Sequence, residues 1–63
     1  MIRKTYYTEN NNKANEIIQQ IIDNYICFVD VETIEMNCYE IIIEMRKEDE
    51  KNIERMLKDI ILK

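Results

Sequence analysis

The sequence predicts a small α+β domain whose elements follow the order strand, helix, strand, strand, helix. Its 63 residues allow one domain, and a domain of this size buries only a small core. Two segments space their apolar residues as one face of a helix does, and three others are rich in the β-branched and aromatic residues of strands. No linker or internal repeat divides them, so residues 1–63 are interpreted as one unit.

The first strand is expected over residues 2–8, where Ile, Thr and Tyr are frequent. Arg3 and Lys4 favour an edge position, because charged edge residues discourage pairing with stray chains. Basic side chains interleaved with aromatic ones also occur in sheets that bind single-stranded nucleic acid by stacking on its nucleobases. Two cationic side chains are too few to dominate such binding. The Tyr rings are expected to cover the end of the core. The polar residues 9–12 then suit a turn and a helix N-cap.

The first helix has the clearest pattern in the chain. Its apolar positions follow the i, i+3, i+4, i+7 series of a one-sided helix and are Ala14, Ile17, Ile18, Ile21, Ile22 and Tyr25. Isoleucine is only a mediocre helix former, so this helix depends on packing its apolar stripe against other elements. A sheet is the expected surface.

Residues 26–34 and 38–46 are predicted to form two strands joined by a three-residue loop, 35–37. In the second of these strands the odd positions from 39 to 45 are apolar and several even positions are acidic, so the odd positions are expected to face the core. The strand at 26–34 matches this face only if the two sequence numbers in each cross-strand pair add up to an even value near 72. A slip of one residue would turn its acidic side chains inward.

The last segment is predicted to be a second amphipathic helix. It opens with the acidic residues Glu48, Asp49 and Glu50, which suit the positive end of a helix dipole. Its apolar positions repeat the helical series and are Ile53, Met56, Leu57, Ile60 and Ile61.

These elements predict a three-stranded antiparallel or mixed sheet in the order first, third, second strand. A right-handed crossover from the first strand to the second places both amphipathic helices on one face of that sheet. The arrangement resembles a split βαβ, ferredoxin-like fold that lacks its last strand. Such an architecture hosts many activities and does not by itself indicate one.

The composition argues against several kinds of chemistry. The chain has no Gly, which the phosphate-cradling loops of nucleotide-binding motifs require. Two Cys and no His fall short of the ligands of an ordinary structural zinc site, and they offer no Cys–His pair for nucleophilic catalysis. A flat sheet surface in so short a chain is not expected to form an enzyme pocket. We therefore expect a non-enzymatic protein without catalytic residues, cofactor or metal.

The charge distribution indicates the kind of partner. The net charge is −4, and residues 30–50 hold eight acids against Arg46 and Lys47. This field repels phosphate backbones and attracts basic surfaces, so we expect a basic protein partner and no direct nucleic-acid binding. No apolar run approaches the roughly 20 residues of a membrane helix, and no signal-peptide stretch precedes the two Cys, so a cytoplasmic location without membrane insertion is expected.

The face of the sheet opposite the helices is the candidate binding surface. It is expected to combine acidic with apolar side chains: Ile26, Phe28, Asp30, Glu32, Ile34, Glu40, Ile42 and Glu44. A solvated acidic face with scattered apolar residues is the plain alternative. So many large apolar side chains on one open face favour contact with a partner or with a second copy in a homodimer.

Our leading hypothesis is a small acidic protein-binding module that also forms a homodimer. Its size, charge and composition are similar in general character to small phage or mobile-element inhibitors, of the anti-CRISPR or another anti-defence type, and suggest that it occupies the basic surface of a nucleic-acid-handling host protein. Two alternatives stay open. One is a dimeric small-ligand sensor of ferredoxin-like type, and the other is an antitoxin-like or structural subunit that is stable only with its cognate.

Overall fold

The computed structural model describes residues 1–61 and has the predicted order of elements. A short 3₁₀ turn, η1, leads into the second helix. The elements are β1 (Ile2–Thr8), α1 (Asn11–Asn24), β2 (Cys27–Glu35), β3 (Cys38–Met45), η1 (Lys47–Asp49) and α2 (Glu50–Leu57). The predicted α+β fold class is therefore confirmed.

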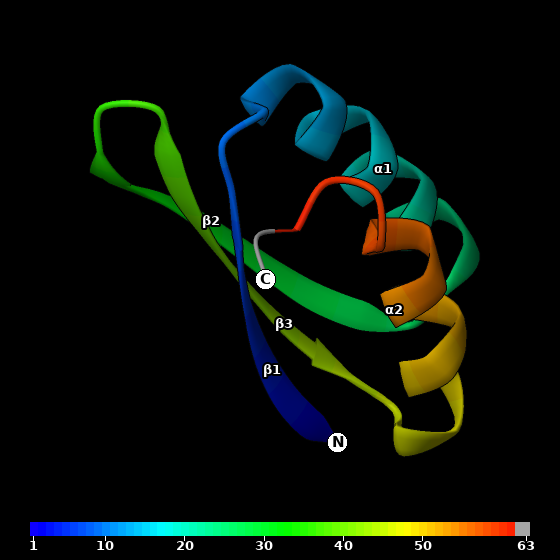
Figure 1. Ribbon diagram of the computed structural model, residues 1–63. Helices are drawn as coiled ribbons and strands as arrows, with labels where there is room; N and C mark the ends of the chain where they lie inside the picture. Colours follow the sequence, from blue (N-terminus) through cyan, green and yellow to red (C-terminus); the bar gives the residue numbers. More distant parts are fainter. Residues whose placement is uncertain (62–63) are drawn as a thin grey trace.

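The three strands form one antiparallel sheet in the order β1-β3-β2, as predicted. Both helices lie against one face of this sheet, and the other face carries no element of residues 1–61 (Figure 1). β1 is an edge strand, as its charged residues suggested.

The core fills the space between the helices and the sheet. Of the odd positions of β3, Ile41, Ile43 and Met45 are fully buried there and Tyr39 is half-buried, which confirms the inward face that their alternation predicted. The buried apolar residues are Tyr6, Ala14, Ile18, Ile21, Ile41, Ile43, Met45, Ile53, Leu57 and Ile60. Ile22 belongs to the predicted stripe of α1 but is exposed, because the part of the helix surface that meets the sheet is narrower than the stripe.

The start of α1 is held by two side chains in succession. The hydroxyl of Thr8, which is fully buried, accepts the backbone N–H of Asn10 at 3.1 Å. The side chain of Asn10 then accepts the backbone N–H of Lys13 at 3.0 Å and caps the helix. The N-cap expected within residues 9–12 is thus Asn10.

The predicted register of β2 and β3 is confirmed, but the predicted loop length is wrong. Paired residue numbers add up to 72 from Cys27–Met45 to Thr33–Tyr39. The register then shifts, so that Glu35 pairs with Cys38 and the loop shortens to two residues. Asn37 occupies this loop with a φ of 65°, a left-handed conformation that Asn tolerates better than most residues. This explains how the chain makes a tight turn without Gly.

The second helix is shorter than its apolar spacing predicted. α2 ends at Leu57, whose carbonyl accepts the N–H groups of both Ile60 and Ile61 at 3.0 and 3.1 Å. Ile60 is still buried, but Ile61 leaves the helix direction and forms an antiparallel bridge with Thr8. The chain therefore returns to the outer edge of β1, where a fourth strand of a ferredoxin-like sheet would run. Within residues 1–61 no helix is long and apolar enough to cross a membrane.

Candidate functional site

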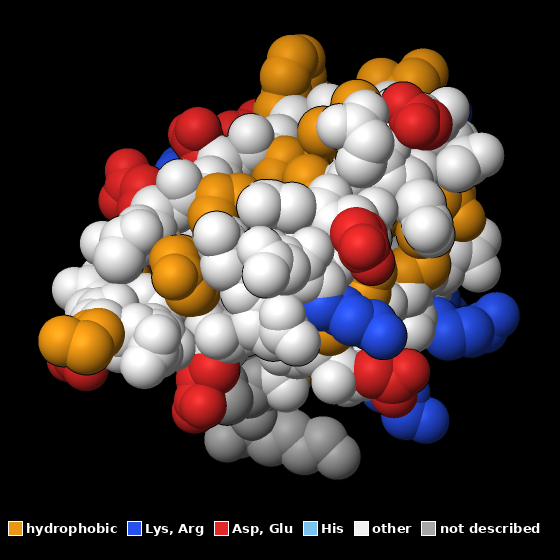
Figure 2. Space-filling view, turned by 90° about the horizontal axis from the view of Figure 1, so that it is seen from above, with side chains coloured by type: hydrophobic (Ala, Val, Ile, Leu, Met, Phe, Trp, Pro, Cys, Tyr) orange, Lys and Arg blue, Asp and Glu red, His pale blue; other side chains and the backbone are white. Residues whose placement is uncertain are grey.

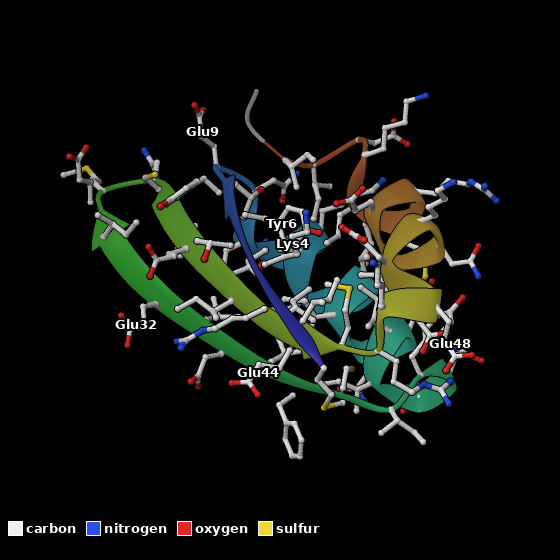
Figure 3. The ribbon with its side chains drawn as sticks, turned by 90° about the horizontal axis from the view of Figure 1, so that it is seen from below. Lys4, Tyr6, Glu9, Glu32, Glu44 and Glu48 are labelled. Carbon is white, nitrogen blue, oxygen red and sulfur yellow. The ribbon has the colours of Figure 1, made fainter. Side chains whose placement is uncertain are left out.

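The uncovered face of the sheet consists of three rows of side chains, which we call the open face. Each row takes one residue from β1, one from β3 and one from β2. The rows are Arg3–Glu44–Phe28, Thr5–Ile42–Asp30 and Tyr7–Glu40–Glu32. Seen from below, the side chains of Glu32 and Glu44 project from the side of the sheet away from the helices (Figure 3).

The open face is strongly acidic. Asp30, Glu32, Glu40 and Glu44 all lie on it, and none of them forms an ion pair with another residue of 1–61. Arg3 is the one basic side chain in the three rows. Glu32 lies directly opposite Glu40, an arrangement in which like charges repel and cost a few tenths of a kcal/mol to about 1 kcal/mol.

An aromatic ring stands among these acids. Phe28 is 68% exposed although it lies in a paired strand, and Ile42 beside it is half-buried. A hollow of about 240 Å³ opens here, lined by Arg3, Phe28, Val29, Asp30, Ile42 and Glu44. Its volume is below the roughly 300 Å³ at which ordinary small-molecule pockets begin.

Two of the predicted open-face residues lie outside the paired rows. Ile26 precedes the first residue of β2, and Ile34 falls at the register shift, where it has no pairing partner on β3. Both are exposed, at 64% and 49%. The even-numbered alternation of β2 therefore holds only from Phe28 to Glu32, because the register shift interrupts it.

The sequence did not indicate the exposure of Val31 and Met36. Val31 lies on the helix side of the sheet yet is exposed, and Met36 at the loop is 91% exposed. The β2–β3 hairpin extends past the helices, so its far end is covered on neither face (Figure 1). A strand rises about 3.3 Å per residue and a helix only about 1.5 Å, so strands of eight and nine residues outreach helices of similar residue count, and this difference is the signal that could have revealed the overhang.

Tyr7 is a further open-face residue that the sequence did not identify. It is half-exposed and pairs with Glu40, whose charge raises the pKa of the Tyr7 phenol. The two tyrosines of β1 were expected to cover the end of the core, and only Tyr6 does so.

On the helix side, a polar cluster ties β1 to α2. The Nζ atom of Lys4 lies 2.8 Å from a carboxylate oxygen of Glu50 and 3.8 Å from one of Glu54. The hydroxyl of Tyr6 donates to Glu54 at 3.3 Å. Glu50 raises the pKa of Lys4, and burial, followed by the charge of Glu54, raises the pKa of Tyr6. This cluster connects two elements of the fold and is already satisfied, so we assign it a structural role.

A second ion pair shapes the entry to α2. The Nε atom of Arg46 donates to Asp49, which is buried, at 2.9 Å, and this contact raises the pKa of Arg46. Glu48 lies 3.6 Å from the same guanidinium group. Two of the three acids that were expected at the helix start, Glu48 and Asp49, therefore pair with Arg46, which precedes the helix, and the third, Glu50, pairs with Lys4 of β1.

The two cysteines lie at opposite ends of the β2–β3 hairpin and on opposite faces of the sheet. Cys27 pairs with Met45 on the helix side, whereas Cys38 pairs with Glu35 near the loop, and both thiols are free. Burial raises the pKa of Cys27, whose sulfur lies 4.0 Å from the carbonyl oxygen of Ile21. A raised pKa makes this thiol less nucleophilic at neutral pH.

The open face thus offers negative charge, the exposed aromatic rings of Phe28 and Tyr7, and a small hollow beside Phe28. Among residues 1–61, no three Cys, Asp or Glu side chains are grouped so that they could hold a metal ion. The chain matches none of the protein-family models, curated proteins or solved structures with which it was compared.

Proposed function

We propose that this chain is a small non-enzymatic protein-binding module whose open face docks on a basic surface of another protein. The observation that carries the proposal is the open face itself, where four carboxylates without ion-pair partners among residues 1–61 share one surface with the exposed ring of Phe28. An aromatic anchor inside a polar surround is the usual composition of a binding hot spot.

Electrostatics favour a basic partner for this face. The repulsion between Glu32 and Glu40 is a cost that the free protein bears and that a cation between them removes. Nucleic-acid-handling proteins carry such cations in the surfaces that contact phosphates. An inhibitor of the anti-defence type, made by a phage or another mobile element, would use the open face to cover that surface.

A homodimer through the same face is the competing arrangement. Phe28 and Ile42 would then pack against the second copy, and the open face would no longer be exposed. Two acidic faces would also have to meet. In the rows of each copy, Arg3 alone would offset the four carboxylates. A basic partner therefore matches the face better than a second copy does.

Affinity capture with matched variants tests the proposal. The open-face variant carries Asp30→Asn, Glu32→Gln, Glu40→Gln and Glu44→Gln. The control variant carries Glu9→Gln, Glu16→Gln, Asp23→Asn and Asp59→Asn, which removes the same charge from exposed positions elsewhere. Proteins captured from a bacterial lysate by the unaltered chain and by the control, but not by the open-face variant, are then purified and titrated against all three.

We expect a purified partner to bind the open-face variant at least about tenfold more weakly than the control, since a buried charge pair contributes 2 kcal/mol or more. Circular dichroism of each variant shows that it is folded. Equal capture of the same proteins by all three forms would refute the proposal.

A further inference from the structure

Building on the proposed function, we infer that the hollow on the open face receives an arginine side chain of the partner. The walls of this hollow carry the chemistry that a guanidinium group needs. Phe28 and Glu44 are direct neighbours across β2 and β3, and Asp30 is the next residue of β2 on the same face. Ile42, half-buried opposite Asp30, gives the hollow an apolar side for the aliphatic part of the incoming chain.

The aromatic wall favours arginine over lysine. A guanidinium group is flat and weakly hydrated, so it can stack on the exposed ring of Phe28 while its edges donate to carboxylates. Its several N–H groups can reach Asp30 and Glu44 together, whereas a lysine ammonium is a compact, strongly hydrated charge that cannot stack in this way.

The position of Arg3 sets the side on which the cation binds. Arg3 lies on β1, across Glu44 from Phe28, and lines the same hollow. Its charge repels a second cation from the β1 side. The incoming guanidinium group is therefore directed toward β2, between Phe28 and Asp30.

A second acidic pair sets the spacing of the partner's basic residues. Glu32 and Glu40 form the next row of the open face. With a rise of about 3.3 Å per strand residue, this row lies roughly 10 Å from the middle of the hollow. Two arginines three residues apart in a polyproline helix lie on the same side and about 9 Å apart, so they match both positions.

The probe is the blocked hexapeptide Gly-Arg-Pro-Pro-Arg-Gly, titrated into the ¹⁵N-labelled chain and followed by NMR. We expect saturable shifts of the amides of residues 28–32 and 40–44. Asp30→Asn with Glu44→Gln should weaken binding at least about fivefold. The matched control, Glu9→Gln with Glu16→Gln, should change it by less than about twofold, the loss expected from the change in net charge alone.

Replacing the ring tests the stacking directly. Phe28→Leu keeps an apolar side chain but removes the aromatic face, and it should weaken binding of the arginine peptide about threefold and binding of the corresponding lysine peptide by less. Equal affinity of the arginine and lysine peptides, equal loss with the control variant, or shifts centred away from the hollow would each overturn the inference.

The two proposals fail in different ways. A partner that loses affinity for the four-acid open-face variant but binds Phe28→Leu and the Asp30/Glu44 variant normally would leave the protein-binding function intact and remove the arginine site. Peptide binding in the hollow combined with equal capture by all forms in the lysate experiment would remove the protein-binding function and leave only a local cation site.

Discussion

Adjacent residues of β1 have opposite surroundings, and this alternation separates structural from exposed polar groups. Lys4 and Tyr6 point to the helix side and contact the two glutamates of α2, whereas Arg3 and Tyr7 stand on the open face. In Figure 3, Lys4 and Tyr6 lie close together on the side of β1 that faces α2. The charge of Lys4 therefore stabilises the contact between β1 and α2, whereas the charge of the adjacent Arg3 stands on the open face.

The helix-side cluster predicts a loss of stability at high pH. The pKa values of Lys4 and Tyr6 are both raised in the folded protein, from ordinary values of 10.5 and 10.0. Above about pH 10 the unfolded chain therefore releases protons that the folded chain still holds, and the free energy of unfolding falls as the pH rises. Denaturant titrations between pH 8 and pH 11 should show this decline.

Tyr6→Phe isolates the tyrosine contribution. The variant lacks the hydroxyl that loses its proton in the unfolded state, so its stability should fall less steeply above pH 10 than that of the unaltered chain. An identical slope in both proteins would show that Tyr6 does not contribute.

The polar residues of β1 also explain why its inward face could not be predicted. Lys4 and Thr8 occupy positions on the helix side that an apolar pattern would have marked. Thr8 can be buried because its hydroxyl has a local backbone partner, and Lys4, which stays partly exposed, can face the helices because two acids of α2 neutralise its charge. β3 presents the opposite case, since its buried residues are all apolar and its facing was predicted correctly.

At the level of elements, the β2–β3 hairpin shows what alternation can and cannot predict. Its register followed from the need to keep acids out of the core. The length of its loop could not be predicted in this way, because the register shift near Ile34 adds a residue to β2 only and leaves the alternation of β3 unchanged.

The loop makes Asn37 a sensitive position. Its φ of 65° is accessible to Asn and Gly but is strained for β-branched residues. Asn37→Val should lower the free energy of unfolding by about 1–2 kcal/mol, whereas Asn37→Gly should leave it close to that of the unaltered chain. Urea denaturation of the three proteins measures the difference, and equal losses in both variants would mean that the Asn side chain, not its backbone conformation, is required.

The pair of glutamates on the hairpin predicts a gain in stability when one is removed. Glu32→Gln ends the repulsion with Glu40 and should raise the free energy of unfolding by about 0.5 kcal/mol at low salt. The gain should shrink in 1 M salt, where charges are screened within about 3 Å. Glu16→Gln on the exposed surface of α1 is the control, and an equal gain there would attribute the effect to net charge alone.

The end of α2 shows the limit of periodicity as a signal. Ile60 and Ile61 continue the helical spacing, and no Gly or Pro marks a stop. The chain nevertheless leaves the helix after Leu57 because Ile60 can be buried from a turn and Ile61 can pair with Thr8. Both contacts depend on residues far away in the sequence, which a local pattern cannot represent.

For the whole molecule, net charge is unevenly distributed: the open face is acidic, whereas basic residues on and around the helices nearly offset the acids there. The open face carries the acids described above, whereas Lys51, Arg55 and Lys58 are exposed on and just after α2. In the view from above, the visible Lys and Arg side chains gather mainly on one side (Figure 2). Such a dipolar protein is turned by the field of a basic partner so that its open face arrives first.

Salt should therefore affect the two possible assemblies in opposite directions. Screening weakens attraction to a basic partner but also weakens the repulsion between two acidic faces. We expect binding to a basic partner or to the arginine peptide to fall between 0.05 and 0.5 M salt, and any homodimer formed through the open face to become tighter. Light scattering over a range of concentrations measures the second effect, and a dimer that dissociates as salt is added would have to form through another surface.

The carboxylates of β2 have one more consequence, because β2 is the other edge of the sheet. Of residues 1–61, none pairs with its outer backbone, and its nine residues include several β-branched types that promote strand addition. Asp30, Glu32 and Glu35 recur along this edge, and a register shift interrupts it, both of which are means by which natural sheets avoid growing into fibrils. The acidity that we propose selects a partner therefore also disfavours pairing of β2 with stray strands, and variants that lose these charges should aggregate more readily.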